Sequence, residues 1–323
     1  MSVSEPVKQD DEAVARTFKL LEDIANGAHT ANANADHHQS PETLPAQTRL
    51  VFPLSIPEYE ALLSRFRQDK ALEYWRRNKL RYSWTEQGRS GRLVVRMPCP
   101  AHCGTALEVE DAIWTCIKNI RKGRGAQMVS STDARLLGNI SRVGTSDSKR
   151  GRQEASADGG FRQKGNIRAL VRIEVGYSQD REELHKLPKK WLEFGANLTI
   201  LVDIPSKTPT QRKSSSPDTS SSTYSVYRTV RSFDDAGHPR KAALMVEKEV
   251  KFELDPDGFL KLHLSDFCLP SNRPTVDLNI HIPHHNLIQA LHNAFEEQAV
   301  FDLGKGYSSD AEIENDIKAA KSS

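Results

Sequence analysis

The chain alternates between segments with apolar residues every third or fourth position and segments with apolar residues at every second position. The first spacing predicts amphipathic helices, and the second predicts half-buried strands. Helices are predicted over 10–25, from Pro57 onward, over 106–122, after Ser178 and over 286–299. Strands are predicted over 80–86, 92–98, 168–175, 198–204, 224–231, 242–254 and 259–267.

The segment 158–204 reads as a strand, a helix and a second strand, and the rest of the chain is organised around it. The second strand, LTILVDI, is almost continuously apolar, as expected of a central strand covered on both faces. Two strands joined by a helix in this way predict a right-handed parallel crossover. Pro188 predicts a kink or restart in the joining helix, and Gly195 suits its end.

Turn residues predict two hairpins. The sequence QGRSG joins strands 80–86 and 92–98, and Asp255-Pro-Asp-Gly joins strands 242–254 and 259–267. Weak strands are expected over 128–143, and the polar stretch 146–160 is expected to be a surface loop.

Composition indicates one packed region with polar tails. The 323 residues are 37% hydrophobic, and the low fraction predicts a core of about two-thirds of the chain. We expect an N-terminal helix and flexible linker over 1–47, a main domain over 48–303 and a flexible tail over 304–323. A Ser-rich, low-complexity insertion over about 205–222 is expected to be disordered.

Other sequence features exclude some classes of protein. No run reaches the roughly 20 apolar residues of a membrane span, and the N-terminus lacks the apolar region of a secretory signal. We therefore expect an intracellular protein, nuclear or cytoplasmic, without a membrane partner. The four cysteines lack CxxC spacing, so Cys99, His102 and Cys103 form only half of a zinc site. The chain has no GxxxxGK[ST] loop and no GxSxG elbow.

Carboxylates around the first strand of the central segment are the candidate chemistry. Asp158 precedes that strand and Glu174 lies near its end, a placement that can hold a divalent metal. The alternation puts Glu174 on the face of Arg172, so a half-solvated strand with balanced charges is the competing interpretation. Glu110 falls within the apolar stripe of helix 106–122, where a buried position and one reaching solvent are equally expected.

Short motifs in this region resemble a known superfamily. They are Asp158-Gly-Gly-Phe161, Leu170-Val-Arg-Ile-Glu174-Val-Gly-Tyr-Ser-Gln179, Trp191-Leu192 and the apolar strand after them. In order and spacing they resemble the PD-(D/E)XK nuclease superfamily, in particular an uncharacterised subgroup with an Asp...Glu-Val-Gly-x-Ser-Gln pattern. The resemblance covers about 79–301. It implies an α/β, restriction-endonuclease-like fold: a mixed β-sheet flanked by helices.

The resemblance also implies a site. Asp158, Glu174 and the Val175 carbonyl would ligate Mg²⁺ or Mn²⁺, and Glu110 would be an additional acidic residue. The lysine expected two residues after the glutamate is replaced by Gly176, and Ala157 replaces the usual proline. Gln179 or Lys186 would have to take the role of the missing lysine.

Three functions follow from these features. The first is a metal-dependent nuclease that hydrolyses phosphodiester bonds. The second is a nuclease-fold protein that has lost cleavage and acts as a nucleic-acid-binding or protein-interaction module, and the third is an α/β scaffold without nucleic acid. The net charge of +2 allows all three, and Arg162, Lys164, Arg168 and Arg172 suit phosphate contacts. DNA is favoured over RNA as the partner, and the oligomeric state is open.

Overall fold

The computed structural model describes the part of the chain that forms helices, strands and their short connections. The described residues are 7–25, 49–78, 80–88, 90–96, 100–124, 129–143, 147–150, 153–177, 181–205, 221–230, 243–251, 255, 257–272, 274 and 277–302. The predicted linker, the Ser-rich insertion apart from its ends, and the C-terminal tail lie outside these residues.

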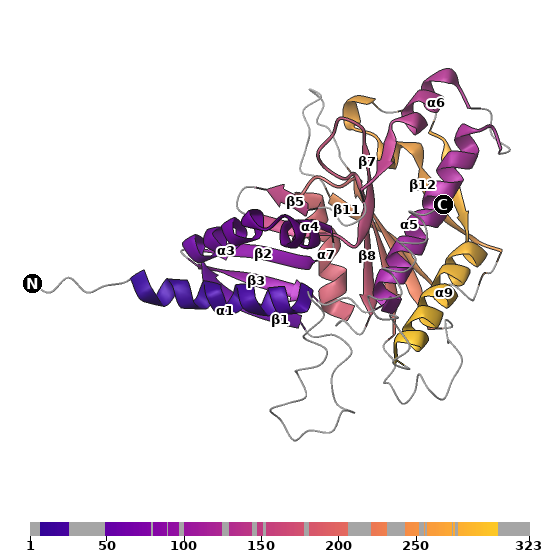
Figure 1. Cartoon of the computed structure of the whole chain (residues 1–323). Helices are drawn as coiled ribbons and strands as arrows, with labels where there is room; N and C mark the ends of the chain where they lie inside the picture. The colour runs from indigo at the N-terminus through magenta and orange to yellow at the C-terminus, as the bar shows by residue number, and fades with distance from the viewer. Residues whose placement is uncertain are drawn as a thin grey trace, which may run out of the picture.

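A six-stranded mixed sheet forms the centre of the molecule (Figure 1). Its strands, in spatial order, are β11 (Ala243–Lys251), β10 (Thr223–Val230), β9 (Leu198–Ile204), β8 (Val171–Tyr177), β7 (Gly159–Gln163) and β4 (Ile140–Arg142). The β8–β9 pair is parallel and the other neighbours are antiparallel. The predicted parallel crossover and the mixed α/β class are therefore confirmed.

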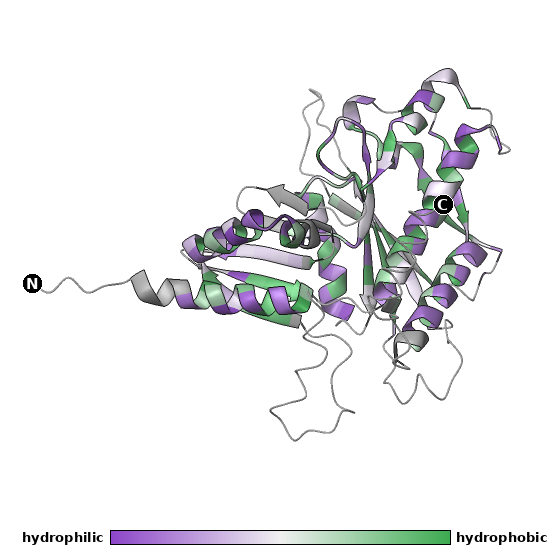
Figure 2. Cartoon of the chain, in the orientation of Figure 1, coloured by the Kyte–Doolittle hydropathy of each residue, from purple (hydrophilic) through white to green (hydrophobic). Residues whose placement is uncertain are grey.

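Helices cover both faces of this sheet. α5 (Pro100–Arg121) packs beside α9 (His284–Asp302), and its buried side chains share a core with Ile173 and Val175 of β8. α7 (Arg181–Glu193) lies on the other face, where Trp191 is fully buried. Figure 2 shows the hydrophobic residues concentrated on the strands, with mixed stripes along the helices.

A second sheet has its own core. Its strands, in spatial order, are β1 (Arg49–Ser55), β3 (Ser90–Arg96), β2 (Arg81–Gln87), β6 (Gln153–Ser156) and β5 (Asp147–Arg150). The helices that contribute to this region are α1 (Val7–Ala25), α3 (Ile56–Gln68) and α4 (Lys70–Asn78). Tyr59 stacks on Trp84 with ring centroids 4.1 Å apart, and Phe18 of α1 contacts Phe66 of α3. The β2–β3 hairpin was predicted, whereas β1 was not.

Two predictions for the region before Asp158 need correction. The stretch 128–143 contains a short strand, β4, as predicted, but its longest element is the helix α6 (Ser131–Gly138), whose first turn is capped where Ser130 accepts the amide of Asp133. The expected polar loop contains β5 and β6, because β6 pairs with β2 and so extends the second sheet. Burial of Ala155 and Ala157 shows that this stretch is not a surface loop throughout.

The predicted pairing of the last strands is also wrong. β12 (Phe259–His263) pairs with β13 (Asn279–Pro283), a strand that the sequence pattern did not reveal, instead of β11. Leu260 and Leu262 of β12 and the isoleucines of β13 are buried in the core shared with α5 and α9, which explains this pairing. The 3-10 helices η3 (Leu264–Phe267) and η4 (Pro270–Asn272) follow β12.

α7 runs through Pro188 as one helix, so the helix does not restart there. Leu184, Pro188 and Trp191 form one buried stripe against the sheet, and this packing offsets the lost backbone hydrogen bond. Gly195 follows with φ of +88°, as predicted for the end of the helix.

Candidate functional site

Asp158 lies where the chain passes from the second sheet into the central sheet, between β6 and β7. The residue is buried, with 3% of its surface exposed. The Oδ2 atom accepts a hydrogen bond of 2.8 Å from the amide of Val175 and lies 3.2 Å from Nε2 of His102. The side chain therefore extends the pairing of β8 beyond the end of β7 and binds α5 at the same time.

His102 carries the charge that balances Asp158. Burial alone would lower the pKa of this imidazole, but the Asp158 carboxylate, through its charge and its hydrogen bond, outweighs burial. With a smaller contribution from Cys103, the pKa of His102 is raised to about 9. At neutral pH the two residues form a buried ion pair.

Glu110 lies among the apolar residues of α5 and is buried, so of the two predicted positions, buried or reaching solvent, the buried one is correct. Its Oε1 accepts a hydrogen bond of 3.0 Å from the amide of Gly160. Its Oε2 accepts two from the Arg142 guanidinium, 3.0 Å from Nε and 2.8 Å from Nη2. Arg142 also pairs with Asp111. Both carboxylate oxygens of Glu110 thus hold protein donors.

Glu174 lies under α7 on the opposite face of β8 from Ile173. It is fully buried, and its Oε1 accepts a 2.8 Å hydrogen bond from the indole nitrogen of Trp191. The guanidinium of Arg172 lies over the same indole ring, 4.8 Å from its centroid. Arg172 and Glu174 share one face, as the alternation predicted, but the half-solvated strand is ruled out because α7 covers that face.

Gly176 occupies the position where the resemblance calls for a lysine. A Cβ atom there would lie 2.4 Å from Cδ2 of Leu184, far inside van der Waals contact. Leu184 is itself fully buried beside Leu201 and Tyr227. Any side chain at position 176 has to displace a packed residue of α7.

The other predicted site residues do not join this cluster. Lys186 is exposed on α7 and pairs with Glu183 at 2.9 Å, and Gln179 lies outside the described residues. Val175 contributes its amide to Asp158, and its side chain is buried. The sequence reasoning missed His102 and Arg142 as partners of the carboxylates. His102 lies in the first turn of α5, before the start at 106 that the sequence predicted for this helix, and Arg142 gave no signal.

Mg²⁺ and Mn²⁺ require a site built from hard oxygen ligands. Among the described residues, no three His, Cys, Asp or Glu side chains form a group that could hold a metal ion. Asp158 and Glu110 bind donors on the α5 side of the sheet, whereas Glu174 binds α7 on the other side. Asp158 and Glu174 are thus held by donors of different helices, and the metal ligand set of Asp158, Glu174 and the Val175 carbonyl remains a prediction.

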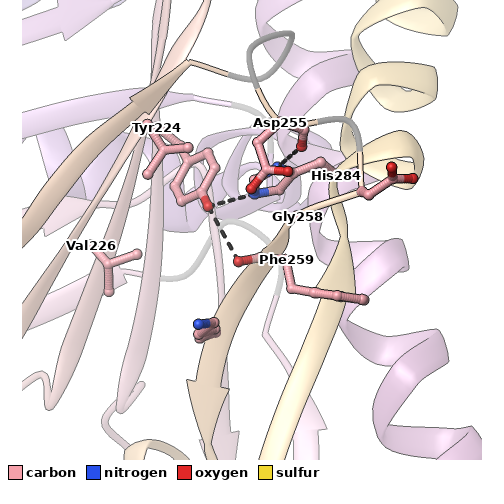
Figure 3. Close-up of a pocket in the computed structure, with 9 residues that line it drawn as sticks. Tyr224, Val226, Asp255, Gly258, Phe259 and His284 are labelled. Atoms are coloured by element: carbon pink, nitrogen blue, oxygen red, sulfur yellow. Dashed lines mark hydrogen bonds between the residues drawn. The ribbon is translucent and has the colours of Figure 1, made fainter.

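A concave site lies elsewhere, between β10, β12 and the first turn of α9 (Figure 3). Its volume is about 450 Å³, and its polar lining includes Tyr224, Asp255 and His284. None of the predicted site residues lines it.

Comparisons with known proteins found a structural similarity but no matching family. No family model matches the chain, and no curated protein matches it. The crystal structure of a candidate nuclease belonging to DUF820, from Anabaena variabilis, is similar over 65% of this chain and 90% of that one, with 14% identity and a TM-score of 0.33. This similarity is distant.

No described helix has both the length and the apolar composition that crossing a membrane requires.

Proposed function

We propose that this chain is a nuclease-fold protein that binds nucleic acid without cutting it. The observation that carries the proposal is that donors of the protein itself already bind all three carboxylates. His102 balances Asp158, Arg142 balances Glu110, and the Trp191 indole binds Glu174. In a metal-dependent nuclease these positions would have to accept a cation and an attacking water.

The surroundings of Gly176 support the same proposal. Phosphodiester cleavage needs positive charge near the developing negative charge of the transition state. Leu184 closes the position from which the motif lysine would supply that charge. Lys186, the predicted substitute, is exposed and paired with Glu183.

The basic residues at the other end of β8 suit a phosphate backbone. They are Lys118, Arg121, Lys122, Arg124, Arg162 and Lys164, all exposed, and we refer to them as the basic end. Arg121 lies within 3.8 Å of the Cβ position of Gly138, and the amide of Lys164 donates to the carbonyl of Asn139 at 2.6 Å, so α5, α6 and the β7–β8 turn meet there. The dipole of α5 favours the cations at its C-terminal end, Lys118 and Arg121 among them. It does not explain Arg162 and Lys164, which lie on a strand and in a turn. Phosphate contacts account for all six.

A Mg²⁺-dependent nuclease is the second candidate. It is favoured by the burial of Glu110, Asp158 and Glu174 around a single strand pair, a costly arrangement that is common at functional sites. In that case the carboxylates of Asp158 and Glu174 and the Val175 carbonyl would hold the ion, which would supply Lewis acidity. Gln179 or Lys186 would then orient the water.

Two assays on the full chain test the proposal. Fluorescence anisotropy should detect binding of a labelled DNA duplex in EDTA, with affinity falling steeply as salt rises. Incubation of supercoiled plasmid with Mg²⁺ or Mn²⁺ should leave it intact. Nicking that is lost in both Asp158→Asn and Glu174→Gln would overturn the proposal in favour of the second candidate.

Charge reversal locates the bound DNA. Lys122→Glu with Arg124→Glu should weaken binding about tenfold or more, because each phosphate contact contributes to affinity through counterion release. The matched control is Arg92→Glu with Lys189→Glu, two exposed cations on β3 and α7 away from the basic end. Equal weakening by both pairs would show that net charge, and not this end of the molecule, is responsible.

A further inference from the structure

The cavity in Figure 3 has a hydrogen-bond chain along one wall. Nδ1 of His284 lies 2.5 Å from the carbonyl of Asp255, and Nε2 lies 2.7 Å from the hydroxyl of Tyr224. A carbonyl oxygen can only accept, so Nδ1 carries the proton and Nε2 accepts from the tyrosine. Tyr224 therefore donates its hydroxyl hydrogen bond to Nε2, the carbonyl of Phe259 lies 3.5 Å from the same oxygen, and the lone pairs of that oxygen are the acceptors beside the cavity.

The charges around the cavity favour a cation. Asp255 and Asp257 are exposed carboxylates at its rim, and Lys261 is the opposing cation among the lining residues. A hydrogen-bond acceptor and two carboxylates together suit a positively charged donor such as an ammonium group. A carboxylate or phosphate ligand would meet like charge at this position.

The remaining walls are apolar. Val226, Val250 and Phe259 line the cavity, and Phe259 is 43% exposed, a high value for a phenylalanine. A volume of about 450 Å³ lies at the small end of ligand sites, so a compact molecule suits it. The walls match a small apolar or aromatic body attached to the ammonium group.

Gly258 makes this arrangement possible. A Cβ atom on it would lie 2.2 Å from Oδ2 of Asp255 and 2.6 Å from Cε1 of His284. The glycine thus lets the Asp255 carboxylate lie close to the His284 ring. The amide of His284 also donates to the carbonyl of Gly258, which fixes the start of α9 beside the cavity.

A purely structural role explains only part of the site. Anchoring the start of α9 to β10 accounts for the Tyr224–His284 hydrogen bond. It does not account for an open space with two exposed carboxylates and an exposed phenylalanine. We propose that this cavity binds a small primary amine with a compact apolar body, held by Asp255, Asp257 and the Tyr224 oxygen. The site is independent of the proposed nucleic-acid binding.

Titration calorimetry on the full chain tests the proposal with phenethylamine as the probe. Saturable binding with a Kd in the millimolar range or tighter is expected, whereas 2-phenylethanol and phenylacetate should bind at least about tenfold more weakly because they lack the cation. The proposal would be overturned if phenethylamine gave no binding heat up to its solubility limit, or if phenylacetate bound as tightly.

Variants that change binding in opposite directions separate recognition from folding. Asp257→Asn should weaken phenethylamine binding about fivefold, and Lys261→Met should strengthen it by a similar factor because a like charge is removed. Asp277→Asn, an exposed carboxylate that binds Ser265 away from the cavity, is the matched control and should leave the Kd unchanged. If Asp277→Asn weakens binding as much as Asp257→Asn, the cavity is not the site.

Discussion

At the scale of single residues, the molecule stabilises buried charge with protein partners. The sequence identified Glu110, Asp158 and Glu174 as acidic residues near one strand, and all three are buried there. It could not identify His102 and Arg142 as their partners, because those contacts join residues 56 and 32 positions apart through tertiary packing. Periodicity reports the face on which a side chain lies, but not the donor that it meets.

The His102–Asp158 pair predicts a pH dependence of stability. The pKa of His102 is raised to about 9 in the folded chain and is near its ordinary value in the unfolded chain. Its stabilising contribution is therefore complete below about pH 6.5 and is lost as the pH rises toward 9. The contribution is on the order of 3 kcal/mol at its maximum.

Urea unfolding of the intact chain at several pH values between 6 and 9.5 measures this effect. Across this pH range the free energy of unfolding should fall more for the wild-type protein than for His102→Gln. All other titrating groups are the same in both proteins, so the difference reports His102. Parallel pH profiles for the two proteins would show that the ion pair contributes nothing.

At the scale of elements, alternation and turn residues predicted what is set locally. The β2–β3 hairpin, the β8–α7–β9 crossover and α9 follow from periodicity and from glycine positions. The β12–β13 pair and the strands β5 and β6 did not follow, because short polar strands gain their stability from a neighbour that lies far away in sequence. The helix does not restart at Pro188, because burial of α7 against the sheet overrides local preference.

The contact between α7 and β8 predicts that replacing Gly176 by alanine destabilises the protein, although the same change in a strand is normally stabilising. Alanine normally stabilises a strand relative to glycine, by about 0.5–1 kcal/mol. Gly176→Ala should instead destabilise by about 1–3 kcal/mol, because its methyl group would displace buried Leu184. Thermal and urea unfolding measure the change.

The double variant Gly176→Ala with Leu184→Ala is the control for that contact. If the steric conflict causes the loss, the combined cost will be smaller than the sum of the two single costs. Strict additivity would mean that residues 176 and 184 do not compete for space.

At the scale of the whole molecule, one segment joins two separately packed regions. The stretch 153–163 pairs with β2 as β6 and then with β8 as β7, and Asp158 lies between the two strands. α1 packs against α3 in the second core, so the predicted N-terminal helix contributes to a packed region. The composition could not reveal that the core is divided into separate clusters.

Ser156 holds this junction at the second sheet. Its hydroxyl accepts the amide of Tyr82 at 3.0 Å in a fully buried position. Ser156→Ala leaves that amide without its partner and should destabilise the chain by about 1–3 kcal/mol in urea unfolding. Ser141→Ala, which removes a more exposed hydroxyl contact with the carbonyl of Arg162, should cost much less. Equal losses would show that the junction has no special dependence on Ser156.

The contact between Gly176 and Leu184 also has an evolutionary consequence. A lysine at position 176 cannot arise by a favourable single change, because its first side-chain carbon already overlaps a buried residue of the neighbouring helix. A smaller residue at position 184 would have to come first, and that change alone opens a cavity in the packing of α7 and costs about 2–5 kcal/mol. Either order of substitution passes through a less stable protein. With Leu184 in place, a lysine at position 176 requires two coordinated substitutions, so stability alone opposes that residue at this position.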